Sequence, residues 1–172
     1  MKVRGQKITP FLWFDRQAEE AMKFYVSVFS AAPGANGDSR VIGIDRYPQA
    51  ALEGPMKGME GKVINGLFEL AGQRFLALDG GPLFKFTEAL SLFLECETQE
   101  EIDYFWEKLS AHPEAEQCGW LKDKYGLSWQ VVPAVLEKLM RGTDPLKANR
   151  VMQALLQMKK LEIAALKRAF EA

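Results

Sequence analysis

The alternation of apolar and polar residues predicts that the first half of the chain consists of strands around one helix. Residues 8–14 (ITPFLWF) form an unbroken apolar run, which is typical of a strand. Apolar residues recur at helical spacing over residues 18–29, and Asp15 stands where the N-cap of that helix is expected. Three further strands are predicted at residues 39–47, 62–70 and 73–79, the last two joined as a hairpin through Ala71-Gly72.

The same order of elements begins again in the second half. Residues 89–96 predict a strand, Thr98 a helix cap, and residues 99–111 an amphipathic helix. A glycine precedes the closing strand in both halves, Gly72 before RFLAL and Gly126 before SWQVV. We interpret this half as a shortened copy of the first, because little more than one strand and a turn fit before its closing hairpin.

The C-terminal part of the chain predicts helices. Asp144 and Pro145 are typical of a helix start, and residues 146–160 carry an apolar stripe; a further helical run covers residues 161–170. Helices this apolar must bury one face, either on their own domain or on a neighbouring subunit, and the sequence leaves both alternatives open. We expect one compact domain overall, made of a first module (1–82), a shortened second module (83–142) and a helical tail (143–172).

Composition and charge exclude several classes of partner. The chain is 48% hydrophobic, which is ample for a core, and its formal net charge of −1 gives no field that would attract nucleic acid or an anionic membrane. No apolar stretch approaches the roughly 18 residues of a membrane span, and the first residues do not resemble a signal peptide. We therefore predict a cytoplasmic protein with neither nucleic acid nor a membrane as partner.

Candidate catalytic groups are few, because the sequence contains none of the motifs GxGxxG, GxxxxGK[ST], HExxH, GxSxG and CxxC. Glu69 and Asp79 lie near strand ends and could act as a base, although Glu69 could equally face solvent and Asp79 could be a turn residue. Cys118 is the candidate nucleophile, provided that Lys122 or Lys124 lowers the pKa of its thiol.

The stretch CGWLKDKYGLSWQVVP (118–133) is the densest in aromatic residues and predicts part of a ligand site. Alternation places Trp129 on one face of its strand and Gln130 on the other, where the amide can donate and accept hydrogen bonds but cannot act as a strong base. Asp123 lies in the turn of this hairpin, where an exposed charge is expected. The predicted ligand-binding residues are Phe11, Trp13, Trp120, Tyr125 and Gln130.

The chain closely resembles the PhnB-like branch of the glyoxalase and bleomycin-resistance (vicinal oxygen chelate) superfamily, which is also called 3-demethylubiquinone-9 3-methyltransferase-like. The resemblance covers essentially the whole chain and is carried by ITPFLWFDRQAEEAMKFYVSVF, GQRFLALDGGPLFKFTEALSLFLECETQEEIDYFWEKLS and QCGWLKDKYGLSWQVVP. It implies an α+β fold of paired βαβββ modules whose mixed sheets curve into a cup, followed by C-terminal helices. It also implies that a homodimer completes the cup.

The resemblance suggests where a metal ion would bind in a metal-using relative. Carried over by strand position, the ligand positions fall near Thr9, Leu76, Ser91 and Gln130. None of these four side chains is a strong ligand for a transition metal, and Leu83 stands where relatives in this branch often have histidine. We therefore expect neither a metal nor another cofactor.

The methyltransferase description finds no support in the residues, because the common S-adenosylmethionine fold requires alternating strands and helices with a glycine-rich first turn. We expect instead a protein that binds a small, partly apolar organic molecule in a metal-free cup at a dimer. One alternative is an enzyme on a small oxygenated substrate: a lyase, a dioxygenase or the methyltransferase of the family name. Another is an interaction protein that acts through its tail helices.

Overall fold

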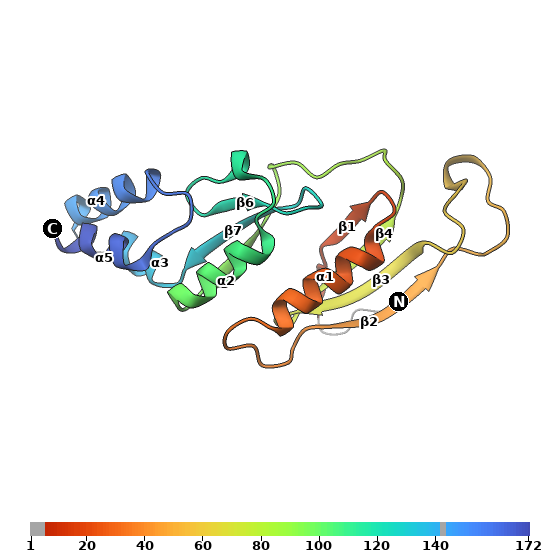
Figure 1. The fold of residues 1–172 in the computed structure, drawn as a ribbon, viewed down its shortest axis with the longest axis horizontal. Coiled ribbons are helices and arrows are strands. Elements are labelled where there is room, and N and C mark those ends of the chain that lie inside the picture. Colours follow the sequence, from red (N-terminus) through yellow and green to blue (C-terminus); the bar gives the residue numbers. More distant parts are fainter. Residues whose placement is uncertain (1–5, 142–143) are drawn as a thin grey trace. The chain divides into compact units, whose positions relative to one another are not determined.

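The chain forms two compact units, with the boundary between Phe86 and Thr87. The computed structural model describes residues 6–141 and 144–172 (Figure 1). Unit 1 is the part before the boundary and unit 2 the part after it. Each unit contains one β-sheet with a long helix on one face, and unit 2 also carries the C-terminal helices. The predicted α+β class, with two mixed sheets of βαβββ-like modules and C-terminal helices, is confirmed.

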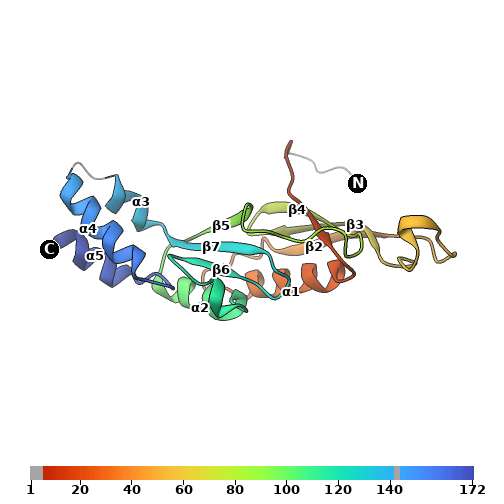
Figure 2. The same cartoon turned by 90° about the horizontal axis from the view of Figure 1, so that it is seen from above.

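Unit 1 is a four-stranded mixed sheet with helix α1 (Ala18–Ser30) along one side, as Figure 2 shows. The strand order is β1-β4-β3-β2; β1 runs parallel to β4, and the other neighbours are antiparallel. The strands are β1 (Phe11–Phe14), β2 (Arg40–Arg46), β3 (Val63–Leu70) and β4 (Gln73–Asp79), and a 3-10 turn, η1 (Gly54–Met56), lies between β2 and β3.

Unit 2 repeats this arrangement with one strand fewer in its sheet. Its order is β5-β7-β6; β5 runs parallel to β7, as β1 does to β4, and β6 is antiparallel to β7. The elements are β5 (Ser91–Cys96), α2 (Gln99–Leu109), η2 (Pro113–Ala115), β6 (Trp120–Lys122) and β7 (Ser128–Pro133). The start of α2 is the predicted cap, since Thr98 Oγ1 accepts a hydrogen bond from the Glu101 backbone N–H and the Glu101 carboxylate accepts one from the Thr98 N–H.

The core of unit 1 lies between α1 and the strand residues that face it. Tyr25 of α1 is fully buried and its ring stacks on Phe68 of β3, with ring centroids 6.4 Å apart. Gly66, two residues earlier on β3, allows Met22 to approach the sheet, because a Cβ atom at Gly66 would lie 2.5 Å from the Met22 sulfur. Burial of these side chains away from water fixes α1 to this one face.

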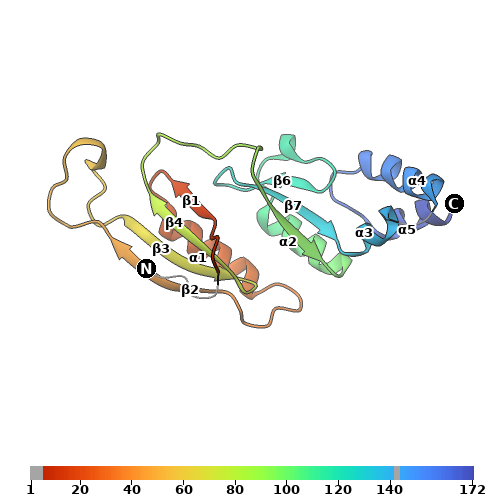
Figure 3. The same cartoon turned by 180° about the vertical axis from the view of Figure 1, so that it is seen from behind.

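The other face of the sheet of unit 1, which is turned toward the viewer in Figure 3, carries no helix from the described residues of this unit. Side chains alternate along a strand, so the residues next to those that meet α1 point to this side. The pairing register brings together on it Phe11, Trp13, Arg40, Asp45, Asn65, Leu67, Glu69, Arg74, Leu76 and Leu78, which we call helix-free face 1.

The corresponding face of the three-stranded sheet in unit 2 is also without a helix. There the register of β5, β7 and β6 brings together Ser91, Phe93, Glu95, Trp120, Lys122, Ser128, Gln130 and Val132, which we call helix-free face 2. Trp129 and Val131 alternate with these residues and are buried on the side of α2, as the sequence predicts for Trp129.

The C-terminal helices α3 (Val135–Met140), α4 (Pro145–Leu156) and α5 (Ile163–Glu171) have a hydrophobic cluster of their own within unit 2. Its buried members are Leu139, Val151, Leu161 and Leu166. The tail therefore buries an apolar face on its own unit, which is one of the two alternatives that the sequence leaves open. In the described ranges, no helix has the length and hydropathy needed to cross a membrane.

Backbone hydrogen bonds fix the tail to the β6–β7 hairpin of unit 2. The N–H groups of Cys118 and Gly119 each donate at 2.8 Å, to the carbonyl oxygens of Met158 and Lys159. Asp144 is the predicted N-cap of α4, since its carboxylate accepts a hydrogen bond from the Leu146 N–H at 2.9 Å. Helix α3 is not predicted by the sequence pattern.

The turn between β6 and β7 is built around Asp123. The sequence predicts an exposed charge at this position, but the Asp123 side chain is fully buried. Its Oδ1 accepts hydrogen bonds from the N–H groups of Tyr125 and Leu127, at 2.9 and 3.1 Å. Its Oδ2 accepts one from the Trp129 indole Nε1–H at 2.8 Å. The carboxylate is buried because these three donors replace its water.

The hairpin between β3 and β4 turns through Ala71 and Gly72, as predicted. Both residues have positive φ, 45° and 79°, which is the two-residue turn that favours the pair Asn-Gly. For alanine this left-handed conformation costs about 1–2 kcal/mol, because the Cβ atom crowds the following carbonyl.

Replacing Ala71 with asparagine should therefore raise the free energy of unfolding by about 0.5–1 kcal/mol, because asparagine tolerates the left-handed region. Urea unfolding followed by circular dichroism measures this. Ala51→Asn, in the exposed loop between β2 and β3, is the control and should change nothing. A lower midpoint for A71N than for the parent protein contradicts the described turn.

Asp123→Asn should destabilise unit 2 by about 1–3 kcal/mol, because the amide places a donor opposite the Trp129 N–H or leaves the backbone donors unpaired. The same change in a Trp129→Phe background should cost less, since phenylalanine has no indole N–H. Thermal unfolding of the four proteins gives the coupling energy between the two side chains. Additive effects of the two substitutions contradict the Asp123–Trp129 hydrogen bond.

Candidate functional site

Helix-free face 1 has an apolar centre. Phe11 of β1 is 52% exposed, and its register partner on β4 is Leu76, which in turn pairs with the buried Leu67 of β3. Three neighbouring strands therefore contribute one apolar side chain each to the same row across the sheet. An exposed phenylalanine in such a row is a surface that an apolar molecule can cover.

One end of helix-free face 1 carries an ion cluster. The buried Glu69 carboxylate lies 2.9 Å from the Arg40 guanidinium and 3.9 Å from the Arg74 guanidinium. Two guanidinium groups therefore approach one carboxylate. Glu69, a predicted catalytic candidate, is an ion-pair acceptor here.

Trp13 lies on helix-free face 1 but is engaged by the loop that follows β4. Its indole Nε1–H donates to the Gly81 carbonyl at 2.9 Å, and its ring packs edge-on against Phe84, with centroids 4.9 Å apart. A Cβ atom at Gly80 would lie 2.2 Å from the Trp13 ring, so the loop needs glycine there. The glycine pair in DGGP thus serves the packing of Trp13.

Helix-free face 2 combines an exposed aromatic ring with a bonded polar pair. Phe93 of β5 is 60% exposed and is the register partner of Gln130 on β7. The Gln130 side-chain amide donates to the Ser91 hydroxyl at 2.8 Å, and Trp120 of β6 pairs with Gln130 from the other side. The sequence prediction includes Gln130 and Trp120 but misses Phe93, which the alternation of β5 could have identified.

Tyr125, the fifth predicted ligand-binding residue, lies in the β6–β7 turn and not on the sheet. Its backbone N–H donates to Asp123, and the Lys124 ammonium lies 5.0 Å from the centre of its ring. Tyr125 is therefore held by contacts within the turn.

A pocket of about 390 Å³ lies at the C-terminal end of the unit 2 sheet, beside α3. It is lined by Phe93, Glu95, Val132, Pro133, Ala134, Leu136, Glu137, Met140 and Arg141. Phe93 and Val132 belong to helix-free face 2, so α3 extends that face with a wall of apolar side chains. Two of its three charged members, Glu137 and Arg141, form an ion pair with each other.

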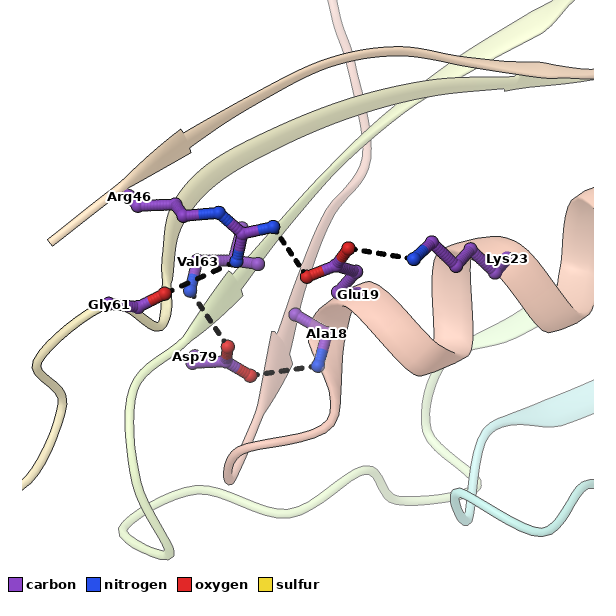
Figure 4. Close-up of polar contacts among 7 residues, drawn as sticks. All are labelled: Ala18, Glu19, Lys23, Arg46, Gly61, Val63 and Asp79. Atoms are coloured by element: carbon purple, nitrogen blue, oxygen red, sulfur yellow. Dashed lines mark hydrogen bonds and ion pairs between the residues drawn. The ribbon is translucent and has the colours of Figure 1, made fainter.

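A second pocket, of about 330 Å³, lies at the N-terminal end of α1 in unit 1. It is lined by Arg16, Glu19, Arg46, Gln49, Glu60, Gly61, Lys62, Val63 and Asp79. Figure 4 shows that its polar groups are bonded to one another: the Arg46 guanidinium donates to the Glu19 carboxylate at 2.7 Å and to the Gly61 carbonyl at 3.2 Å. The Lys23 ammonium donates to the other oxygen of Glu19, which lowers the pKa of this carboxyl group.

Asp79 connects three elements beneath this pocket. Its Oδ1 accepts a hydrogen bond from the Ala18 N–H at 2.8 Å and its Oδ2 accepts one from the Val63 N–H at 2.9 Å (Figure 4). Asp79 is 1% exposed and ends β4, so it is not a turn residue. The prediction that Asp15 is the N-cap of α1 is wrong. The N-cap position is Gln17, whose side chain makes no capping hydrogen bond, and Asp79 accepts the hydrogen bond from the first turn of the helix instead.

The two candidate carboxylates of unit 1 do not lie together. Glu69 lies on helix-free face 1, whereas Asp79 is on the opposite face of the same sheet, under α1. In unit 2, the Cys118 sulfur accepts a hydrogen bond from the Gln117 amide at 3.3 Å. The other thiol, Cys96, is buried, and burial raises its pKa to about 12, so it is a poor nucleophile at neutral pH.

The positions that correspond to metal ligands in the superfamily do not fit a transition metal. Leu76 has no donor atom, and the weak donors Ser91 and Gln130 are hydrogen-bonded to each other. Within residues 6–141 and 144–172, no three histidine, cysteine, aspartate or glutamate side chains are grouped as a metal site.

Comparison with known proteins identifies the family. The family described as 3-demethylubiquinone-9 3-methyltransferase matches residues 6–132. The structure of the PhnB protein from Bacillus cereus is 42% identical, covers 75% of this chain and 100% of its own, and has a TM-score of 0.59. Protein PA1353 from Pseudomonas aeruginosa has a similar fold, with 15% identity, a TM-score of 0.54, and coverage of 75% of this chain and 98% of its own.

No curated protein matches the chain significantly. The family match ends at Val132, so α3, α4 and α5 lie outside it. The resemblance to the PhnB-like branch that was inferred from the sequence is confirmed: this chain belongs to the PhnB-like 3-demethylubiquinone-9 3-methyltransferase family.

Proposed function

We propose that this chain is a cytoplasmic, homodimeric protein that binds a small, partly apolar organic molecule, without a metal ion, on the helix-free faces of its sheets. The observation that carries the proposal is the apolar row of helix-free face 1, in which Phe11 is 52% exposed next to Leu76. A strand residue of this size gains about 1.5–3 kcal/mol when it is fully buried, and a ligand can supply that burial.

The composition of both faces supports a ligand with a flat, apolar body. Ligand sites are mostly apolar and contain a few polar groups that fix orientation. Helix-free face 1 has the Arg40–Glu69 pair beside its apolar row, and helix-free face 2 has the Gln130–Ser91 pair beside Phe93. Aromatic and quinone-like metabolites match this combination of an apolar ring and polar substituents.

The family description names a methyl transfer, which would make the protein an enzyme. Catalysis by a base requires a carboxylate within hydrogen-bond reach of the reacting group. Here the Asp79 oxygens each accept a backbone N–H, and the Glu69 carboxylate is paired with arginine. These contacts favour binding over the enzymatic alternative.

The homodimer is proposed because apolar side chains of the faces remain exposed in the single chain, and the family resemblance implies a dimer. Light scattering coupled to size exclusion should give a mass of twice 19.4 kDa. A mass of 19.4 kDa at micromolar concentration would contradict the dimer and leave the binding proposal to the next experiment.

A screen of aromatic and quinone-like compounds should find molecules that raise the melting temperature, because binding to the folded state stabilises it. For such a compound, Phe11→Ala should lower the affinity by about tenfold or more, through the loss of the buried ring. Isothermal titration calorimetry with the parent protein and the variant measures this.

The matched control is Leu146→Ala, on α4, because Leu146 is also a large exposed apolar residue but lies on neither helix-free face. It should leave the affinity unchanged. Equal loss of affinity in F11A and L146A, or no stabilising compound in the whole screen, would contradict the proposed function.

A further inference from the structure

The pocket beside α3 has the size and the lining of a small-molecule site. Its volume of about 390 Å³ lies within the range of ligand pockets. Most of its lining side chains are apolar: Phe93, Val132, Pro133, Ala134, Leu136 and Met140. The Phe93 ring is 60% exposed, so it offers an aromatic surface to a ligand in this pocket.

The wall of the pocket on the side of α3 is fixed by the C-terminal helices. Leu136 and Met140 line the pocket and also pack against the hydrophobic cluster of these helices. The cluster therefore holds this wall in place before a ligand binds, which lowers the cost of binding. Because the family match ends at Val132, the α3 wall belongs to a part of the chain that the family description does not cover.

The charged side chains of the pocket leave one carboxylate without a partner. Glu137 and Arg141 form an ion pair with each other. Glu95 on β5, the third charged lining residue, makes no hydrogen bond or ion pair with any residue that the structure describes. The cation of helix-free face 2 is Lys122, which pairs with Glu88.

Glu95 and the Phe93 ring lie on the same side of β5. The two residues are separated by one position, so their side chains point to the same face, about 7 Å apart along the strand. Glu95 is exposed, so a ligand that covers Phe93 can also reach its carboxylate. The pocket thus combines an apolar surface with an accessible negative charge.

We propose that this pocket binds a compact organic cation, an ammonium group on an apolar body. The apolar body covers Phe93 and the side chains of α3, and the ammonium group donates a hydrogen bond to the Glu95 carboxylate. The inference goes beyond the proposed function, because it concerns a pocket that contains no residue of helix-free face 1 and a different class of ligand.

The test uses two probes of the same shape, 1-adamantylmethylamine, which is protonated at neutral pH, and the neutral alcohol 1-adamantylmethanol. Titrations followed by nuclear magnetic resonance give both affinities and the place of binding. The parent protein should bind the amine about threefold more tightly, which is the effect of one accessible ion pair. The methyl signals of Leu136, Met140 and Val132 should shift with both probes.

Three variants assign the contributions of the two side chains. Glu95→Gln, which keeps the size of the side chain and removes its charge, should make the two affinities equal. Phe93→Ala should weaken both probes by about fivefold or more and keep the preference for the amine. Glu171→Gln, at an exposed residue of α5 outside the pocket, makes the same change of net charge and should leave the preference intact.

Four results would overturn the inference: neither probe binds, the parent protein shows no preference for the amine, the preference persists in E95Q, or E171Q removes it as E95Q does. Shifts that spare the methyl groups of α3 would also contradict it. None of these results bears on the proposed function, which is tested with aromatic compounds and Phe11→Ala.

Discussion

The structure depends on one constraint: each sheet is covered by a helix on one side only. In unit 1, the close approach of Met22 to Gly66 and the stacking of Tyr25 on Phe68 fix α1 to that side. Strand alternation then sends every second side chain to the opposite side, where Phe11 and the apolar residues beside it have no helix to cover them. An apolar surface formed in this way is a consequence of the fold.

Two of the buried acids, Asp79 and Asp123, serve the backbone. Asp79 accepts the N–H groups of Ala18 and Val63, and so ties the start of α1 to β3 and β4. Asp123 does the same for the β6–β7 turn, with the Trp129 indole as an additional donor. A carboxylate in such a place is held by donors that replace water. Stabilisation of the fold therefore accounts for Asp79, one of the two candidate bases in the sequence, and for Asp123.

Local interactions in this fold could be predicted from the sequence, and long-range ones could not. The Thr98 cap and the Ala71-Gly72 turn depend on neighbours within three residues, so their spacing reveals them. The bond from Ala18 to Asp79 spans 61 positions, and no local pattern distinguishes Asp79 from the nearer Asp15. For the candidate site, alternation predicted which strand residues share a face, but the exposure of each one depends on the three-dimensional packing: Phe11 is exposed, whereas Leu67 is buried. Helix α3 escaped prediction because its six residues are too few to show a helical period.

The central claim, that helix-free face 1 is where a small apolar molecule binds, is tested most directly by nuclear magnetic resonance. Amide and methyl signals would be recorded while a stabilising aromatic compound is titrated into labelled protein. The account predicts that shifts and intermolecular contacts concentrate on Phe11, Leu67 and Leu76, and that methyl groups under α1 change little. Contacts confined to the polar pocket around Arg16 and Lys62, or to the pocket beside α3, would contradict it.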